Sequence, residues 1–394
     1  MTIPRDRHWL EVFKVFLRLG LTSFGGPVAH LGYFREEFVT RRKWLDDRVY
    51  ADLVALCQFL PGPASSQVGI AIGLSRAGYG GALAAWTGFT LPSAVLMTLF
   101  AYGVGVLGDF LGVGWVHGLK AAAVAVVAQA VLGMARTLTP DLPRAMVAGA
   151  ATAIALLVPS TSGQIGAILF GAACGLALPR VTAAPATGAH LPLTIGRRAG
   201  AVFLALFVLL LAGLPLLMTV SPSHGLAVFE AFYRSGSLVF GGGHVVLPLL
   251  QASVVEPGWV GDDVFLAGYG AAQAIPGPLF TFSAYLGAVM GGWTGAMICL
   301  IAIFLPSLLL VPGALPFWED IRRKPMAQTA LRGVNAAVVG LLLAALYDPV
   351  FIAGIQNAGD LILAVAAFLL LVARKTPPWL VVAISAAGGA LLAA

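Results

Sequence analysis

The segment QFLPGPASSQ, residues 58–67, interrupts an apolar stretch of the chain with the triplet Pro61-Gly62-Pro63. Glycine permits a sharp reversal of the backbone, and proline suits the first turn of the helix that follows. A second interruption, Phe24-Gly25-Gly26-Pro27, lies nearer the N-terminus. The apolar pieces beside these breaks are roughly 13–16 residues long, whereas a helix needs about 20 to cross a bilayer. We therefore expect helical hairpins that enter a membrane and turn back at these tips.

The same pattern recurs in the second half of the chain. The separation between matched residues drifts only from 216, for Phe16 and Phe232, to 214, for Pro92 and Pro306. Spaced matches at Gly, Pro, Trp and Arg indicate an internal repeat. The other matches pair Arg18 with Arg234, Gly20 with Gly236, Phe24-Gly25-Gly26 with Phe240-Gly241-Gly242, Trp44 with Trp259, Asp47 with Asp262, Gln58 with Gln273, Pro61-Gly62-Pro63 with Pro276-Gly277-Pro278, and Ser93 with Ser307.

The composition places these hairpins in a membrane. Of 394 residues, 59% are hydrophobic and 10% are charged, whereas a soluble domain carries about 25% charged residues. A soluble fold of this size could not bury so much apolar surface. The net charge of +6 lies in short clusters between apolar runs, which argues against nucleic-acid binding. The cysteines at 57, 174 and 299 are far apart and predict neither disulfides nor a zinc site. We predict an all-α polytopic membrane protein.

Hydropathy and loop charge give the expected topology. Basic clusters such as Arg41-Arg42-Lys43 and Arg322-Arg323-Lys324 mark cytoplasmic loops and predict a cytoplasmic N-terminus and an extracytoplasmic C-terminus. Re-entrant hairpins are expected over 9–42, 48–76, 226–257 and 263–290. Complete spans are expected over 79–103, 117–136, 144–159, 163–179, 198–219, 292–313, 326–347, 359–373 and 377–394.

Loop charges also set the two repeats in opposite orientations. Around Trp44 the chain reads RRKWLDDR, which is basic, and around Trp259 it reads EPGWVGDD, which is acidic. Opposite orientation is the inverted-repeat plan of secondary transporters, whose substrate site lies near the midplane where broken helices meet. The alternative is a parallel duplication with accidental loop charges. We assign residues 1–179 to an N-terminal transporter repeat, 180–198 to a cytoplasmic linker and 199–394 to an inverted C-terminal repeat.

The tips predict an anion site. If each break is a hairpin tip, helix N-termini converge in the membrane, each with roughly +0.5 elementary charge and unpaired N–H groups. Such a cluster favours an anion without buried lysines. The alternative is that the breaks are simple kinks between ordinary membrane helices. The tip residues are Phe24, Gly25, Gly26, Pro61, Gly62, Pro63, Phe240, Gly241, Gly242, Pro276, Gly277 and Pro278.

Polar side chains near the tips are the candidate ligands. Arg18 and Arg234 lie six residues before their Phe-Gly-Gly turns, where a guanidinium would suit an oxyanion; the alternatives are an interfacial position or pairing with Glu11 and Glu230. The neutral candidates are Gln58, Ser65, Ser66, Gln273 and Thr281, and the alternative for these is helix–helix hydrogen bonding. His30 and His244 are candidate proton carriers, although such histidines are more often packing residues.

These motifs resemble the chromate ion transporter family, the ChrA proteins, in its long two-domain form. The resemblance rests on the stretch from Phe24-Gly25-Gly26-Pro27 to Gln67, and on Phe240-Gly241-Gly242-Gly243-His244 with Gln273 and Pro276-Gly277-Pro278. It implies an inner-membrane exporter that confers chromate resistance, with sulfate as the natural competitor. We expect chromate and the lipid bilayer as partners, no nucleic acid and no cofactor, and we leave a homodimer open.

Other functions stay open at this stage. A sulfate or other oxyanion carrier, which includes an importer, would use the same kind of site, and an anion channel would share the composition. An intramembrane enzyme would need a catalytic pair within the bundle, and the sequence shows no phosphate loop, metal motif or nucleophile elbow. We therefore expect a transporter and not an enzyme.

Overall fold

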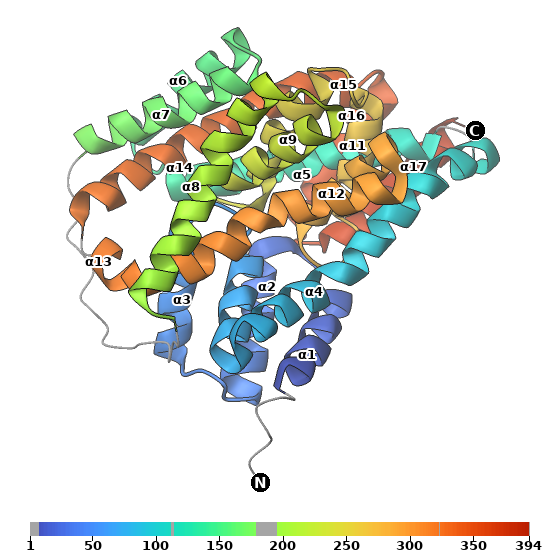
Figure 1. Ribbon diagram of the computed structural model, residues 1–394. Helices are drawn as coiled ribbons and strands as arrows, with labels where there is room; N and C mark the ends of the chain where they lie inside the picture. The colour runs from blue at the N-terminus through green and yellow to red at the C-terminus, as the bar shows by residue number, and fades with distance from the viewer. Residues whose placement is uncertain (1–7, 112–113, 179–194, 323, 394) are drawn as a thin grey trace.

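The computed structural model describes residues 8–111, 114–178, 195–322 and 324–393, and within these ranges every regular element is a helix (Figure 1). This confirms the prediction of an all-α polytopic membrane protein. The predicted linker 180–198 lies largely outside the described residues. The first repeat comprises α1 His8–Thr22, α2 Gly26–Arg35 with its extension η2 Glu36–Arg41, α3 Asp47–Phe59, α4 Ala64–Leu111, α5 Gly114–Leu138, α6 Leu142–Leu157 and α7 Thr161–Ala177.

The second repeat follows a helix without a counterpart, α8 Arg197–Val220. Short helical pieces replace some of the longer helices of the first repeat. The elements are α9 His224–Leu238, the continuous stretch η3 Gly243–Val245, α10 Val246–Leu250 and η4 Gln251–Val255, then α11 Asp262–Ala272, η5 Leu279–Thr281, α12 Phe282–Ala314, η6 Leu315–Phe317, α13 Trp318–Arg322, α14 Pro325–Ala345, η7 Leu346–Phe351, α15 Ile352–Gly354, α16 Ala358–Val372 and α17 Pro378–Ala393.

The helix breaks lie where the glycines and prolines predict them. Gly62 and Gly277 have φ of 123° and 101°, in the left-handed region that other residues rarely adopt. The Phe-Gly-Gly turns also require glycine, since Gly25 and Gly241 have left-handed φ of 97° and 74°. Each repeat therefore begins with helices that stop at a tip and reverse, as expected for paired hairpins.

A further matched break separates the last half-length helix of each repeat from the span that follows. The backbone is non-helical at Ala77 and Gly78 within α4, and at Gly291 and Gly292 within α12. Gly78 and Gly292 have nearly equal φ, 61° and 60°. The predicted hairpins ended at 76 and 290 and the predicted spans began at 79 and 292, so each break falls at the predicted boundary.

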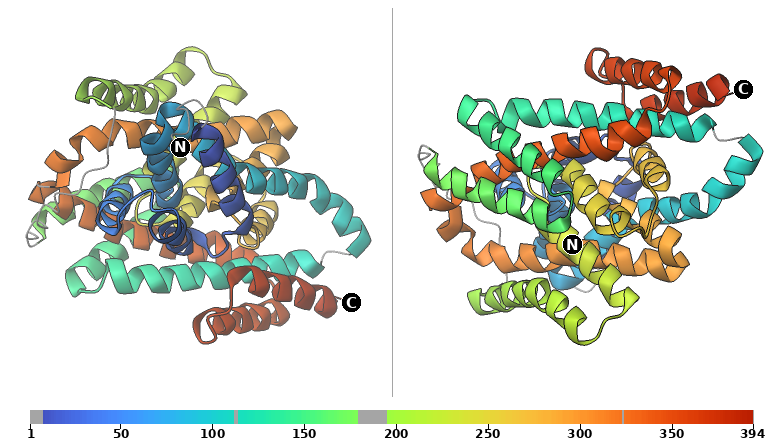
Figure 2. Two further views of the ribbon diagram at one scale, coloured as in Figure 1. Left: turned by 90° about the horizontal axis from the view of Figure 1, so that it is seen from below. Right: turned by 90° about the horizontal axis from the view of Figure 1, so that it is seen from above.

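The described residues contain five helices that are long and apolar enough to cross a membrane, namely Ala64–Val104, Gly114–Leu138, Arg197–Val220, Leu279–Ile321 and Pro325–Gly354. The other spans expected from hydropathy correspond to α6, α7, α16 and α17. These helices have 16, 17, 15 and 16 residues, which is short of the roughly 20 needed for a straight crossing. They pack as the pairs α6–α7 and α16–α17 (Figure 2).

Helices of each repeat pack against helices of the other repeat. The long helix α5 of the first repeat packs against α16 and α17 of the second, and α14 of the second packs against α6 and α7 of the first (Figures 1 and 2). The broken helices α4 and α12 pack on one another between these groups. The consecutive sequence repeats are therefore interlocked in space, while α1, α2 and α3 of the first repeat lie together at one end of the molecule (Figure 1).

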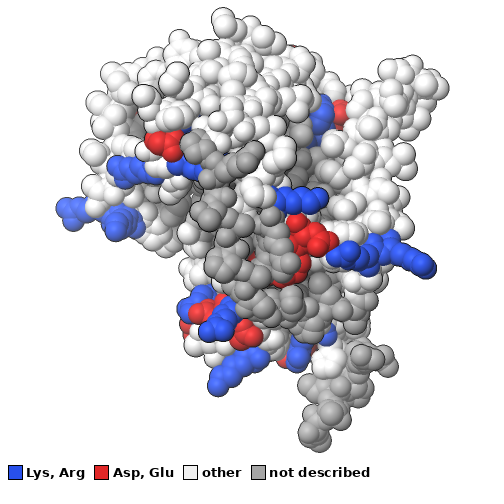
Figure 3. Space-filling view, turned by 90° about the vertical axis from the view of Figure 1, so that its left-hand side faces the viewer, with Lys and Arg blue, Asp and Glu red and all other residues white. Residues whose placement is uncertain are grey.

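Exposed charged side chains are unevenly distributed over the surface. Figure 3 shows Lys, Arg, Asp and Glu over the middle and lower parts of one face, with an almost uncharged upper part. At the α1 end of the molecule, Arg42 bonds to Glu37 and Glu11 at 2.7 and 3.2 Å. Arg42 and Arg76 also lie over the Trp44 ring, at 5.4 and 5.0 Å. These residues, which we call the Trp44 cluster, join the outer ends of the first two hairpins.

Candidate functional site

The tips of the two repeats are joined by a matched pair of backbone hydrogen bonds. The N–H of Gly62 donates to the carbonyl of Val239 at 2.7 Å, and the N–H of Gly277 donates to the carbonyl of Ser23 at 3.0 Å. Ser23 and Val239 end α1 and α9, where helices leave carbonyls unpaired. Each repeat thus caps the negative end of a helix from the other repeat, close to the positive ends of the helices that start at the tips.

The Pro-Ser pairs of α4 and α12 form the walls against which these tips rest. A Cβ atom on Gly62 would lie 2.6 Å from Ser307 Oγ, and one on Gly277 would lie 2.7 Å from Ser93 Oγ. Both contacts are too short for any side chain, so each tip needs glycine for space as well as for φ. Ser93 and Ser307 were not predicted as site residues, although the repeat match at Pro92-Ser93 and Pro306-Ser307 was a signal for them.

The Phe-Gly-Gly turns meet at the same centre. A Cβ on Gly243 would lie 3.0 Å from Cγ of Pro27, so the start of η3 touches the start of α2. Phe24 packs on Trp379 of α17, with ring centroids 6.1 Å apart. On the second repeat, a Cβ on Gly241 would lie 3.5 Å from Oδ1 of Asn335. Asn335 of α14 is a polar neighbour that the sequence prediction omitted.

Several buried polar atoms around the tips have no hydrogen-bond partner among the described residues. Among them are the hydroxyls of Ser23, Ser66 and Ser283, the amide Nε2 of Gln273, and two acceptors, Oε1 of Gln67 and Oδ1 of Asn335. The three serines are at most 2% exposed. Most buried polar atoms in proteins are paired, and leaving one unpaired costs free energy, so such a group indicates a place for a ligand. Hydroxyl and amide groups can all donate to an oxyanion.

Two other predicted neutral ligands, Thr281 and Gln58, are already engaged or exposed, and the neighbouring Gln67 is engaged as well. The Thr281 hydroxyl donates to the carbonyl of Pro278 at 2.8 Å and so closes its own turn. Gln67 Nε2 donates to the carbonyl of Pro61 at 2.6 Å and to Ser307 Oγ at 3.2 Å, which ties the tip together. The Gln58 side chain is exposed on α3, whereas its repeat counterpart Gln273 is partly buried. The paired glutamines are therefore not equivalent in the structure.

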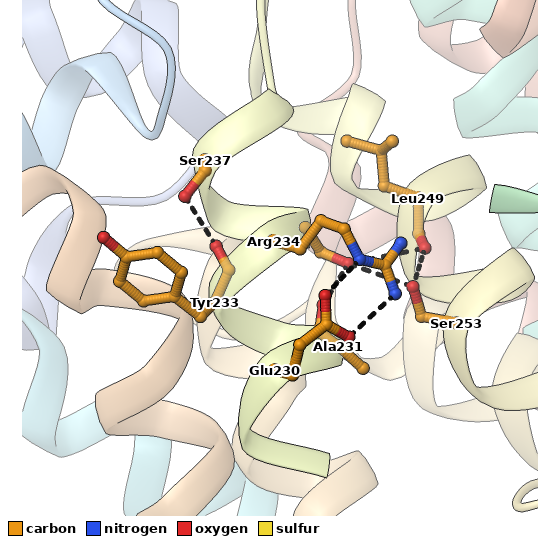
Figure 4. Close-up of polar contacts among 8 residues, drawn as sticks. Glu230, Ala231, Tyr233, Arg234, Ser237, Leu249 and Ser253 are labelled. Carbon is orange, nitrogen blue, oxygen red and sulfur yellow. Dashed lines mark hydrogen bonds and ion pairs between the residues drawn. The ribbon is translucent and has the colours of Figure 1, made fainter. Parts of the chain in front are cut away.

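The matched arginines also differ. Arg234 forms two hydrogen bonds with Glu230, at 2.6 and 3.2 Å, on the side of α9 that faces Ser253 (Figure 4). Both side chains are largely buried, 18% and 9% exposed, so each satisfies the other. Arg18 is exposed on α1. Pairing of Arg234 with Glu230 was one of the alternatives that the sequence left open.

The two histidines contact different groups. His30 Nε2 lies 3.2 Å from the carbonyl of Ser23, and its Nδ1 lies 3.4 Å from Oγ of Ser65. His244 Nδ1 lies 2.8 Å from the hydroxyl of Tyr269. The structure thus brings His30, Ser65, Ser23 and Gly277 into one connected group, in which the last residue comes from the other repeat.

Helix breaks in matched pairs and a polar centre inside an apolar bundle are typical of a multi-pass membrane transporter with an internal repeat. The chain belongs to the chromate transporter family, whose sequence profile, described as "Chromate transporter", matches residues 10–176 and 226–390. The two matched segments correspond to the two repeats and leave α8 between them.

Relatives resemble the chain over most of its length. It is 28% identical over 352 residues, 88% of this chain and 82% of the relative, to the "Chromate transport protein" of Pseudomonas aeruginosa. It is 26% identical over 394 residues to the "Probable chromate transport protein" of Synechococcus elongatus, covering 97% of this chain and 95% of the relative. The "Chromate transport protein" of Cupriavidus metallidurans is 26% identical over 341 residues, 85% and 81% of the two chains. No solved structure matches the chain.

Proposed function

We propose that the protein carries chromate out of the cytoplasm, and that the anion binds where the tips of the two repeats meet. The observation that carries this proposal is the group of buried, unpartnered donors on Ser23, Ser66, Ser283 and Gln273. A tetrahedral oxyanion can accept hydrogen bonds from several directions, and these donors come from both repeats. The names of the relatives support chromate as the substrate.

Helix ends supply the favourable electrostatics. Ser66 lies in the first turn of α4, whose free N–H groups carry roughly +0.5 elementary charge. The opposing negative ends of α1 and α9 are capped by Gly277 and Gly62 of the other repeat. The capped carbonyls repel an anion less than open ones would, and the uncapped N–H groups attract it.

The interlocked repeats support alternating access. Opening the site to either side requires one group of helices to rock against the other around the bound anion. Export of two negative charges from a negative-inside cell gains roughly 4.6 kcal/mol per 100 mV, from about 2.3 per charge. We propose the inner membrane as the location, with the N-terminus and the Trp44 cluster in the cytoplasm and the C-terminus outside, and the repeats at 1–179 and 199–394 as the functional units.

The test is chromate flux into inside-out vesicles or proteoliposomes with an imposed potential. Proteoliposomes that contain the protein should take up chromate faster than empty liposomes, with saturation at high chromate, when the potential favours anion entry. Flux equal to that of empty liposomes would reject the proposed function. Flux that rises linearly with chromate, accompanied by single-channel currents, would indicate an anion channel instead.

A sulfate or other oxyanion carrier is the second candidate, because sulfate has the same shape and charge as chromate. The open donors are hydroxyls and an amide, which recognise a tetrahedral oxyanion by shape and do not distinguish its central atom. Competition decides between the two. Sulfate that abolishes chromate flux at equal concentration would favour the sulfate carrier, and chromate flux that persists under excess sulfate would favour the chromate exporter.

A further inference from the structure

His30 connects three parts of the proposed site. It lies on α2, is 1% exposed, and packs edge-on against Phe89 of α4 with ring centroids 5.2 Å apart. Its Nδ1 faces Ser65 in the first turn of α4, and its Nε2 faces the carbonyl of Ser23. That carbonyl also accepts the N–H of Gly277. One imidazole therefore touches both hairpins of the first repeat and, through a shared carbonyl, the tip of the second.

The partner at Nε2 decides where the ring carries its hydrogen. A carbonyl oxygen only accepts, so Nε2 must donate to Ser23. In the neutral ring Nδ1 is then an acceptor, and the Ser65 hydroxyl donates its hydrogen to it. With neutral His30, the hydrogen of the Ser65 hydroxyl points toward the histidine.

The second repeat shows that the fold does not need this polar pair. The repeat offset that aligns the Phe-Gly-Gly turns places Val246 at the position of His30, and the offset of the Pro-Gly-Pro triplets places Phe280 at the position of Ser65. Both are apolar and buried, at 0% and 1% exposed. Since the same tip architecture forms around an apolar pair, a role in transport explains the His30–Ser65 pair better than packing does.

We propose that His30 takes up a proton when the oxyanion binds, and that the Ser65 hydroxyl links the two events. This rests on the proposed function. A proton on Nδ1 turns that atom into a donor, so the Ser65 oxygen accepts and its own hydrogen is free to point at the anion. The anion in turn offsets the cost of burying an imidazolium. The proton comes from the buffered solution, whose buffer is deprotonated in return, and no bond to the anion forms or breaks. A dianion would then travel with one proton, so that one net negative charge crosses the membrane in place of the two counted above for the anion alone.

Among the described residues, His30 has no carboxylate partner, so a bound anion would supply the negative charge opposite a protonated ring. α4 presents Ser65 and Phe89, and α3 presents Tyr50, whose hydroxyl donates to the Leu31 carbonyl at 2.6 Å. The charges on α2 and η2 are engaged at the far end of these helices. Arg35 bonds to Asp47 of α3, and Glu37 bonds to Arg41 and Arg42. Within the described part of the chain, His30 forms no ion pair.

Calorimetry tests the proposal on the full-length protein in detergent. Sodium chromate, and sodium sulfate as a dianion that does not change protonation near neutral pH, are titrated in two buffers of different ionisation enthalpy. The wild type should take up about one proton per bound anion, and its affinity should fall up to tenfold for each pH unit of increase in the range where His30 is neutral. His30→Gln keeps a donor toward Ser23 but does not titrate, so its proton uptake should vanish and its affinity should become independent of pH.

Two further variants make the result specific. His224→Gln removes an exposed histidine that packs on Trp259 outside the proposed site and should keep full proton uptake. Ser65→Ala keeps His30 but removes the hydroxyl link, so anion binding should persist. The change in the logarithm of the affinity per pH unit should be at least threefold smaller than in the wild type. For chromate, subtracting the uptake of His30→Gln from that of the wild type removes any contribution from the anion itself.

The outcomes separate this proposal from the proposed function. Anion binding without proton uptake in the wild type, or full uptake retained in His30→Gln, would overturn the role of His30 and leave oxyanion transport standing. If neither chromate nor sulfate binds and vesicles show no flux, the proposed function fails and this inference fails with it.

Discussion

The Nζ atom of Lys120 lies 2.8 Å from Oδ1 of Asp263, which joins α5 of the first repeat to the start of α11 in the second. The lysine side chain is 3% exposed and the aspartate 65% exposed. The carboxylate is thus the partner that keeps a buried ammonium paired at the end of the bundle opposite the Trp44 cluster.

This pair predicts an asymmetric response to substitution. Asp263→Asn leaves a buried charge with a weaker partner and should lower the free energy of unfolding by about 1–3 kcal/mol. Lys120→Met removes the charge with little change of shape and should cost less, and the double variant should be more stable than Asp263→Asn alone. The measurement is thermal unfolding in detergent, with the exposed neighbour Asp262→Asn as control. Equal effects of Asp262→Asn and Asp263→Asn would contradict the pairing.

The tip glycines should not tolerate alanine. In Gly62→Ala and Gly277→Ala the new Cβ would meet Ser307 Oγ or Ser93 Oγ at 2.6 or 2.7 Å, and φ would remain left-handed. Strain of this kind costs on the order of 1–3 kcal/mol. We expect lower thermal stability and at least tenfold slower chromate flux. Gly133→Ala on α5 is the matched control, because a Cβ there meets nothing within 4 Å. Wild-type behaviour of both tip variants would refute the contact.

The unpartnered serines should matter for binding and not for folding. Ser66→Ala and Ser283→Ala remove hydroxyls that have no partner within the described structure, so the thermal stability should stay the same or rise. If each hydroxyl donates to the bound anion, its loss should weaken chromate affinity by roughly three- to tenfold. Thr98→Val, which removes a buried hydroxyl bonded to its own helix at the Ala94 carbonyl, should leave affinity unchanged. Unchanged chromate affinity in both serine variants would move the site away from the tips.

The Arg234–Glu230 pair should act in stability. Arg234→Gln leaves Glu230 buried without its partner and should lower the thermal stability, while Arg234→Gln with Glu230→Gln should restore most of it. We expect the double variant to retain chromate flux within about threefold of the wild type. A double variant that is stable and inactive would instead make Arg234 a ligand.

The inverted orientation can be checked by labelling. Lys43 and Gly258 occupy matched loops beside Trp44 and Trp259, and both have left-handed φ, 52° and 75°. In a background without native cysteines, Lys43→Cys should react with an impermeant thiol reagent only from the cytoplasmic face, and Gly258→Cys only from the outside. Reaction of both from one face would establish a parallel duplication.

The local features of this fold follow from the sequence alone. Glycine and proline mark the tips, and apolar runs mark the spans, because backbone freedom and transfer into lipid depend on the residues of one segment. The break at Gly78 falls between a predicted hairpin and a predicted span for the same reason. The repeat and its family were also readable, since they reside in matched residues such as Pro61-Gly62-Pro63 and Pro276-Gly277-Pro278.

Tertiary structure decided everything that joins residues far apart in the chain. The sequence around Gln58, which is exposed, does not distinguish it from Gln273, which is partly buried. The local sequence also does not show that Arg234 pairs with Glu230 and not with a substrate. Helix packing brings the Val239 carbonyl to the N–H of Gly62 and the Ser23 carbonyl to His30 Nε2. The first hydrogen bond and the position of the hydrogen on the His30 ring both depend on that packing. Those partners are selected by the interlocking of the two repeats, a global arrangement that no single segment encodes.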